Sequence, residues 1–357
     1  MTKLQEQVQQ RVDELVDTEL GLQVVVYQNG ELVVDAVAGE GIEPDTLFYS
    51  ASTGKAATAT VANVLADRGV LEYDAPIADV WPEFAVHGKE KATLRHILTH
   101  TVGLPALAPD TTPDDLADWP KITSYLATAE PWWEPGTKTT YHAETFGYLV
   151  GEVVRRTTGR SISDVLREIA EPLGIADEVY FGVPLDQQHR VAQLVEPAGA
   201  EDTFAMLAGM FGKVTPAAII PRAALCNSPE HLAAETPSAG VLTARGIAKL
   251  YAALIGEVDG VRLVRPERVA EITGPAFTGK DELLGNDATW ALGYPIGRLG
   301  SSAEESPTSF GIPGMGGSAA WADARAGVSF ALTRRLFDPA QSASAVEIGN
   351  LVAKTLC

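Results

Sequence analysis

A hydroxyl and an amine stand one helical turn apart in residues 48–55, at the beginning of an expected helix. Apolar residues recur at helical spacing from Ala57 until Gly69 ends the pattern. Residues three apart share one helix face, so the amine of Lys55 can reach the hydroxyl of Ser52. This is a nucleophile beside a base, provided that burial or a neighbouring cation keeps the amine neutral. Free N–H groups at the helix start suit an oxyanion. Alternatively, Ser52 caps the helix and Lys55 is solvated.

The composition indicates a large acidic globular protein. Its 357 residues, 46% of them hydrophobic, suffice for one large domain or two intertwined subdomains. Lys and Arg number 27 against 47 Asp and Glu, a net charge of −20 that disfavours nucleic acid and anionic lipid as partners. Cys226 and Cys357 suggest neither a disulfide framework nor a metal site, and we expect no cofactor. Without an apolar signal-like segment or a run of about 18 apolar residues, we expect a cytoplasmic protein with no membrane partner.

Strand patterns occupy both ends of the chain. Residues 4–16 have helical spacing, and two apolar runs flank Asn29-Gly30, a strong hairpin signal. A last helix is expected over 341–354, after three short strand patterns at 289–296, 317–322 and 328–333. This arrangement favours an α/β fold of the α+β kind, with one sheet built from both chain ends.

The middle of the chain is rich in helical patterns and has one irregular segment. Apolar periodicity predicts helices that include residues 146–153, 161–169 and 243–255. Residues 198–239 are rich in Ala, Met, Phe and Pro without clean periodicity, which suits a mobile apolar wall or lid. His96 and His100 have the spacing of a helical metal pair, but they lack an obvious third ligand, so structural roles are favoured.

Three separated stretches together resemble the serine β-lactamase and penicillin-binding-protein superfamily, especially its β-lactamase-like esterases and transacylases. The first stretch is Ser52-Thr53-Gly54-Lys55, a Ser-x-x-Lys motif. The second is Tyr141-His142-Ala143, and the third, at 310–317, stands in place of that family's Lys/His-x-Gly strand. The combination is far more specific than any one stretch, and it favours the catalytic interpretation of Ser52.

The resemblance implies a fold and a set of catalytic roles. The fold would be β-lactamase-like, with a central antiparallel sheet flanked by helices. Residues 1–75 and 235–357 would form the sheet-containing subdomain and 76–234 a mainly helical insertion, with the site between them. Ser52 would be the acylated nucleophile, Lys55 the amine that shares its proton, and Tyr141 the second proton-carrying group. Backbone N–H groups of Ser52 and Met315 would form the oxyanion hole.

Two departures from the family pattern bear on the substrate. Ala143 stands where β-lactamases and peptidases of the family have an asparagine, and Ile312 stands where they have a lysine. These polar groups hold the amide and the carboxylate of a β-lactam or D-Ala terminus. We therefore expect a neutral ester or thioester in a pocket lined by apolar groups such as Trp132 and Met206. The expected substrate contacts are Trp133, His142, Phe211, Ile312 and Gly314.

Several functions remain open at this point. The first hypothesis is a serine esterase that forms a Ser52 acyl-enzyme with a small-molecule ester and releases the acyl group to water. The alternative is an acyltransferase that passes the group to an amine or alcohol. β-Lactamase or D-amino-acid peptidase activity and a noncatalytic binding role are less favoured. The oligomeric state is not specified by the sequence.

Overall fold

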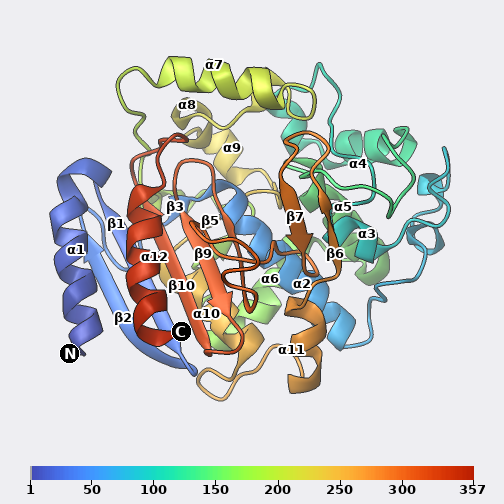
Figure 1. Ribbon diagram of the computed structural model, residues 1–357. Helices are drawn as coiled ribbons and strands as arrows, with labels where there is room; N and C mark the ends of the chain where they lie inside the picture. Colours follow the sequence, from blue (N-terminus) through green and yellow to red (C-terminus); the bar gives the residue numbers. More distant parts are fainter. Residues whose placement is uncertain (1) are drawn as a thin grey trace.

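Both ends of the chain build one five-stranded antiparallel sheet in the computed structural model, which describes residues 2–357 (Figure 1). The strand order is β2-β1-β10-β9-β8, so the N-terminal hairpin lies directly against the C-terminal strands. The bounds are β1 Leu22–Gln28, β2 Glu31–Ala38, β8 Ser309–Pro313, β9 Ala319–Asp323 and β10 Val328–Arg334. The predicted fold class is confirmed.

The hairpin turn between β1 and β2 follows its sequence signal. Asn29 and Gly30 have φ angles of 50° and 84°, both left-handed, as the tight turns of twisted hairpins require. Strand β1 is buried along nearly its whole length, because it is an inner strand between β2 and β10 and helices cover both of its faces.

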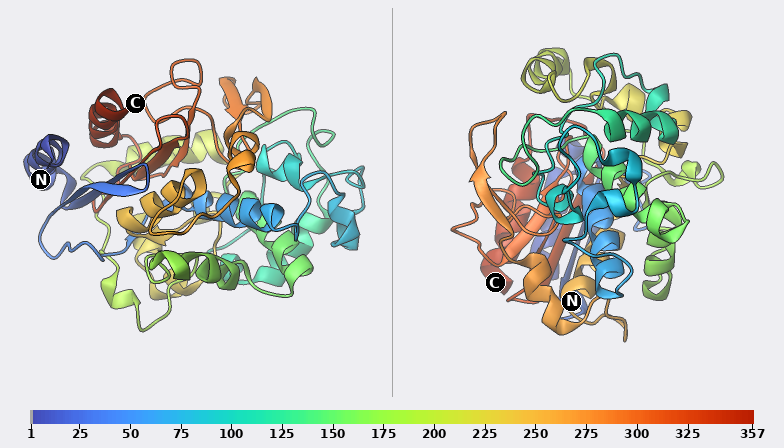
Figure 2. Two further views of the ribbon diagram at one scale, coloured as in Figure 1. Left: turned by 90° about the horizontal axis from the view of Figure 1, so that it is seen from below. Right: turned by 90° about the vertical axis from the view of Figure 1, so that its right-hand side faces the viewer.

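Helices cover both faces of the sheet. Helices α1 (Lys3–Glu19) and α12 (Ala343–Leu356) lie side by side on one face (Figure 2) and bury Val8, Val12 and Ile348 against it. Helix α10 (Ala244–Ile255) packs on the other face and contacts β1, β9 and β10. Of the helices within residues 2–357, none is both long and apolar enough to cross a lipid bilayer.

The centre of the helical layer is α2 (Lys55–Asp67), which follows a 3₁₀ turn over Ala51–Gly54. The structure therefore places Ser52 in a tighter turn just before the α-helix, rather than inside its first turn. Helix α2 is buried from Lys55 to Leu65, because it contacts α10 and the helices α5 and α6. The surrounding helices are α3 (Leu94–Leu98), α4 (Trp119–Thr128), α5 (Thr145–Thr158), α6 (Ile162–Ala170) and α11 (Pro266–Thr273). One core joins α2 to both proposed parts of the chain, and the division into subdomains stays a prediction.

Two segments differ from the sequence-based expectations. The segment expected to be irregular forms three helices, α7 (Ala200–Phe211), α8 (Ala223–Cys226) and α9 (Pro229–Ala233). The strand expected over 289–296 ends at residue 290, because its pairing is confined to the separate hairpin of β6 (Phe277–Lys280) and β7 (Asp287–Trp290). Residues 291–294 instead turn back, and Ala291 N donates to Tyr294 O at 2.8 Å.

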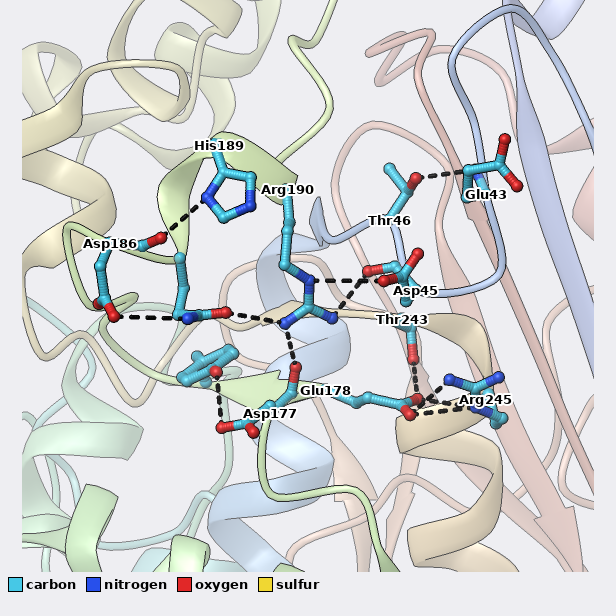
Figure 3. A network of polar contacts seen from close by, with 12 residues as sticks. Glu43, Asp45, Thr46, Asp177, Glu178, Asp186, His189, Arg190, Thr243 and Arg245 are labelled. Carbon is cyan, nitrogen blue, oxygen red and sulfur yellow. Dashed lines mark hydrogen bonds and ion pairs between the residues drawn. The ribbon is translucent and has the colours of Figure 1, made fainter.

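A small sheet of β3 (Phe48–Tyr49), β5 (Val241–Leu242) and β4 (Val179–Tyr180) leads directly to Ser52. Polar contacts hold this sheet to its surroundings (Figure 3). The guanidinium of Arg190 donates to the carbonyls of Asp45 and Asp177 at 2.9 Å each. The Glu178 carboxylate accepts from Arg245, at the start of α10, at 2.6 Å. These bonds fix the chain just before β3 and just before β4, and therefore the small sheet that leads to the nucleophile turn.

Candidate active site

The turn that carries Ser52 is held by close backbone contacts and an uncommon conformation. Ala51 has a φ angle of 44°, in the left-handed region that residues with a side chain seldom occupy. A Cβ on Gly54 would lie 2.3 Å from the backbone of Ala239, and a Cβ on Gly314 would lie 2.1 Å from the carbonyl oxygen of Ser50. Glycine is required at both contacts, and the turn is wedged between the chain next to β5 and the end of β8.

Lys55 is directed at Ser52 from inside the protein. Its side chain is 1% exposed, and Nζ donates to Ser52 Oγ at 3.0 Å and to the Ser238 carbonyl at 2.6 Å. The same Nζ lies 5.1 Å from the centre of the Tyr141 ring. The predicted Ser52 and Lys55 pair therefore lies within hydrogen-bond distance, with the predicted tyrosine beside it.

Asp281 holds the backbone at Tyr141 from a hairpin far along the chain. Its carboxylate, 4% exposed, accepts from Tyr141 N at 2.9 Å and from Thr140 Oγ1 at 2.6 Å. The backbone N–H groups of Leu283 and Leu284 donate to the same carboxylate at 2.9 Å each. One carboxylate thus joins the loop after β6 to the loop that carries Tyr141.

Aromatic rings fix the direction of the Tyr141 side chain. The ring of Trp290, on β7, is nearly parallel to that of Tyr141, with 6.1 Å between ring centres and an angle of 3°. His100 fills the space behind both, 5.1 Å from the Tyr141 ring and 4.1 Å from the Trp290 ring. Burial holds the pKa of His100 well below its usual value, so the imidazole is neutral. Sequence reasoning missed Asp281 and Trp290, because no local pattern links them to Tyr141.

The histidines of this region have structural partners. His142 is fully buried, donates from Nδ1 to the Thr140 carbonyl at 2.7 Å and accepts from Leu104 N at 3.1 Å. Burial lowers its pKa to about 4. His96 Nδ1 accepts from Thr93 N at 3.2 Å, inside the capping box of α3. His100 Nδ1 accepts from His142 N at 3.0 Å. His96 and His100, the two histidines with helical spacing, therefore each have their own hydrogen-bond partner.

The backbone N–H groups of Ser52 and Met315 are the predicted oxyanion donors. Gly314 N donates to the Ser318 carbonyl at 2.7 Å, and Thr53 N donates to the Ser50 carbonyl at 3.1 Å. By contrast, within residues 2–357, neither Ser52 N nor Met315 N has an acceptor. Both Ser52 and Met315 line the same cavity, as an oxyanion hole requires.

The cavity next to Ser52 has a volume of about 330 Å³ and an apolar wall. Two of the predicted substrate contacts, Phe211 and Ile312, line it together with Ser52 and Tyr141. Further wall residues, which the sequence did not single out, include Leu207, Ile220, Pro221 and Glu144. Leu207 and Phe211 lie four residues apart on α7, but their neighbours in the sequence are also apolar, so no contrast marks this face.

Other residues expected at the substrate lie outside this cavity lining. The indole N–H of Trp133 donates to the Thr101 carbonyl at 3.0 Å, while His142 and Gly314 have the packing contacts described above. Trp132 and Met206 are 47% and 58% exposed. The structure therefore places Ser52, Tyr141, Met315, Phe211 and Ile312 along one cavity. Lys55 is not part of its lining and reaches Ser52 Oγ from inside the protein.

Comparison with known proteins gives related hydrolases over nearly the whole chain. The family model described as Beta-lactamase matches residues 8–350. The protein "Esterase/beta-lactamase LipL" of Mycobacterium tuberculosis is 36% identical over 340 residues, which cover 88% of this chain and 77% of that relative.

Two solved structures extend the similarity to the fold. A family VIII carboxylesterase is 31% identical, with a TM-score of 0.88 over 99% of this chain and 98% of that chain. A penicillin-binding protein homologue from Caulobacter crescentus is 32% identical, with a TM-score of 0.85 over 99% of this chain and 98% of that chain.

Proposed function

Because the chain belongs to the beta-lactamase family of hydrolases, we propose that it is a serine esterase that forms an acyl-enzyme on Ser52. The observation that carries this proposal is that Ser52 and Tyr141 line one cavity while Lys55 Nζ lies 3.0 Å from Ser52 Oγ and 5.1 Å from the centre of the Tyr141 ring. Within residues 2–357, the backbone N–H groups of Ser52 and Met315 have no acceptor. The esterase name of the relative from M. tuberculosis and the carboxylesterase with the same fold support the same reaction class.

Each group has one task in this reaction. Ser52 Oγ attacks the ester carbonyl carbon, and its proton moves to the Lys55 and Tyr141 pair. The carbonyl oxygen becomes an oxyanion that accepts hydrogen bonds from Ser52 N and Met315 N. The bond to the alcohol oxygen then breaks, and Tyr141 returns the proton to that oxygen. Water then attacks the carbonyl carbon of the acyl-enzyme, the same groups transfer its proton to Ser52 Oγ, and the carboxylic acid is released.

The cavity favours a neutral small-molecule ester. Ile312 and Ala143, in place of the lysine and asparagine of related β-lactamases, both line it. Among the described residues of its lining, none is Lys, Arg or His. A substrate carboxylate would therefore lose its water without gaining a charged partner there, which disfavours a β-lactam or a peptide terminus.

The test is intact-protein mass spectrometry with short p-nitrophenyl esters, while p-nitrophenol release is followed. We expect an acyl adduct that needs Ser52, is absent from Ser52→Ala and decays with turnover, and a lower kcat in Tyr141→Phe. Ser124→Ala is the matched control, because Ser124 is an exposed serine on α4. An adduct on Ser52→Ala, or none on the wild-type protein, contradicts the proposal. Cephalosporin hydrolysis as fast as ester cleavage would contradict the substrate class.

Transfer to an amine or alcohol is a second candidate, and the apolar wall of the cavity favours it. Leu207, Phe211 and Ile220 give the acyl-enzyme a surrounding in which an acceptor with an alkyl group displaces water favourably. Product analysis with and without added alcohol separates the two outcomes. A constant share of free acid at rising alcohol concentration would rule out transfer to that acceptor.

A further inference from the structure

Glu144 is an acidic residue inside the apolar cavity, directly before α5. It occupies the N-cap position of that helix, where a side chain ordinarily accepts from the first backbone N–H groups. The Glu144 side chain makes no such bond, and it lines the cavity with Ser52 and Tyr141 instead. Helix capping therefore does not account for this carboxyl group.

The nearest cation does not pair with Glu144. Lys55 is close enough to lower the pKa of Glu144. Its Nζ, however, donates to Ser52 Oγ and to the Ser238 carbonyl. Burial raises the pKa of Glu144, and the charge of Lys55 offsets only part of this effect. The remaining neighbours in the cavity are mainly apolar, among them Leu207, Phe211, Ile220 and Ile312.

Glu144 is partly buried, whereas two buried glutamates of the protein have close partners. Glu152 Oε1 accepts from Arg155 at 2.6 Å, and Glu178 Oε1 accepts from Arg245 at 2.6 Å. In the chain from residue 2 to 357, no donor lies within hydrogen-bond distance of the Glu144 carboxyl group. The Glu144 carboxyl group is therefore partly buried in an apolar cavity and has no protein donor among the described residues, so a ligand with a positive donor would gain a charge-assisted hydrogen bond there.

We propose that Glu144 binds a primary ammonium group of the acyl donor or of the acceptor, while Leu207 and Phe211 hold the alkyl segment next to it. The inference rests on the proposed function, because it takes the cavity beside Ser52 as the substrate site. An ammonium group supplies the positive donor that the carboxylate lacks. A short alkyl chain supplies the apolar surface that the cavity wall buries. The predicted ligand class is therefore a short primary alkylamine or an ester that carries one.

Calorimetric binding of n-butylammonium and n-butanol tests the inference without any turnover. We expect the wild-type protein to bind the ammonium ion about tenfold more tightly than the alcohol, as for a charge-assisted hydrogen bond. Glu144→Gln keeps the size of the side chain and removes its charge, so it should abolish this preference and leave butanol binding unchanged. Glu230→Gln, an exposed glutamate on α9, is the matched control. Equal preference in wild type and Glu144→Gln would overturn the inference, once thermal unfolding verifies that the variant is folded.

A second experiment determines whether the ammonium group belongs to the acyl donor or to the acceptor. With p-nitrophenyl butyrate as donor, formation of N-butylbutanamide from added butylamine identifies an acceptor site. Competitive inhibition by butylammonium without amide formation identifies a donor site. If p-nitrophenyl butyrate is not cleaved at all, the proposed function fails, while the calorimetric preference still decides the role of Glu144.

Discussion

Replacing Asp281 by asparagine tests whether a distant carboxylate positions Tyr141. The carboxylate accepts four hydrogen bonds, and three of them reach the same oxygen, Oδ1. An asparagine oxygen can keep those three, which leaves its NH₂ group facing the N–H of Tyr141, one donor against another. Loss of one charge-assisted bond and of the negative charge behind the others should lower the free energy of unfolding by about 2–4 kcal/mol.

The effect on catalysis should be separable from the effect on stability. Tyr141 acts on protons and not on binding in the proposed reaction, so Asp281→Asn should lower kcat and leave KM nearly unchanged. A displacement of the phenol by about 1 Å would cost roughly 10²-fold in rate. Urea unfolding and p-nitrophenyl acetate hydrolysis measure the two quantities.

Asp287→Asn is the matched control on the same hairpin, because Asp287 is exposed. Its free energy of unfolding should stay within about 0.5 kcal/mol of the wild-type value. If Asp281→Asn also stays within that limit and retains its kcat, the carboxylate does not hold the Tyr141 loop, and the reasoning is refuted.

Three further changes test the pH response, the nucleophile turn and the cavity wall. Burial lowers the pKa of His231 to about 4, so the unfolded chain binds this proton first and stability falls from about pH 6.5 downward. Between about pH 6.5 and 5, His231→Leu should reduce the pH dependence of the free energy of unfolding, measured with urea, by up to about 1.4 kcal/mol per pH unit. An unchanged pH dependence contradicts this role of His231. Gly314→Ala should abolish ester hydrolysis, because its Cβ would clash with Ser50 O. Gly209→Ala on α7, where a Cβ has open space, should retain activity. An active Gly314→Ala would show that the nucleophile turn can move to accept the Cβ. Phe211→Ala should shift the kcat/KM optimum toward longer acyl chains, and an unmoved optimum places the acyl group elsewhere.

The fold was predictable where local patterns and global packing agree. The hairpin at Asn29-Gly30 and the strands expected over 317–322 and 328–333 belong to the observed sheet, whereas the strand expected over 289–296 does not. Helix α7 was missed because its residues are apolar on nearly all sides: Phe204 is buried, while Met206 and Met210 are largely exposed. A helix without a polar face lacks the periodic contrast on which sequence reasoning depends.

The site residues also divide into those that a local sequence pattern predicts and those that only tertiary packing brings to the site. Ser52 and Lys55 are three residues apart, so helical geometry alone predicts their contact, which the structure has at 3.0 Å. Tyr141 required the family resemblance, because nothing in its own segment directs it to Ser52. Asp281 lies 140 residues beyond Tyr141, and tertiary packing alone brings them together. The sequence therefore gives the reacting groups more readily than the groups that position them.

The charge of the cavity gives a physical reason for two departures from the family pattern. A lysine at position 312 and an asparagine at position 143 would favour a substrate with a carboxylate and an amide. Ile312 and Ala143 remove both partners, while Glu144 lines the same cavity with a carboxyl group. A carboxylate substrate would now meet an acid instead of a base, which adds repulsion to the lost attraction. On the proposed assignment, the acyl-transfer groups are retained and the preferred charge of the ligand is reversed. Glu144→Gln separates the repulsive part of this selection from the loss of the lysine.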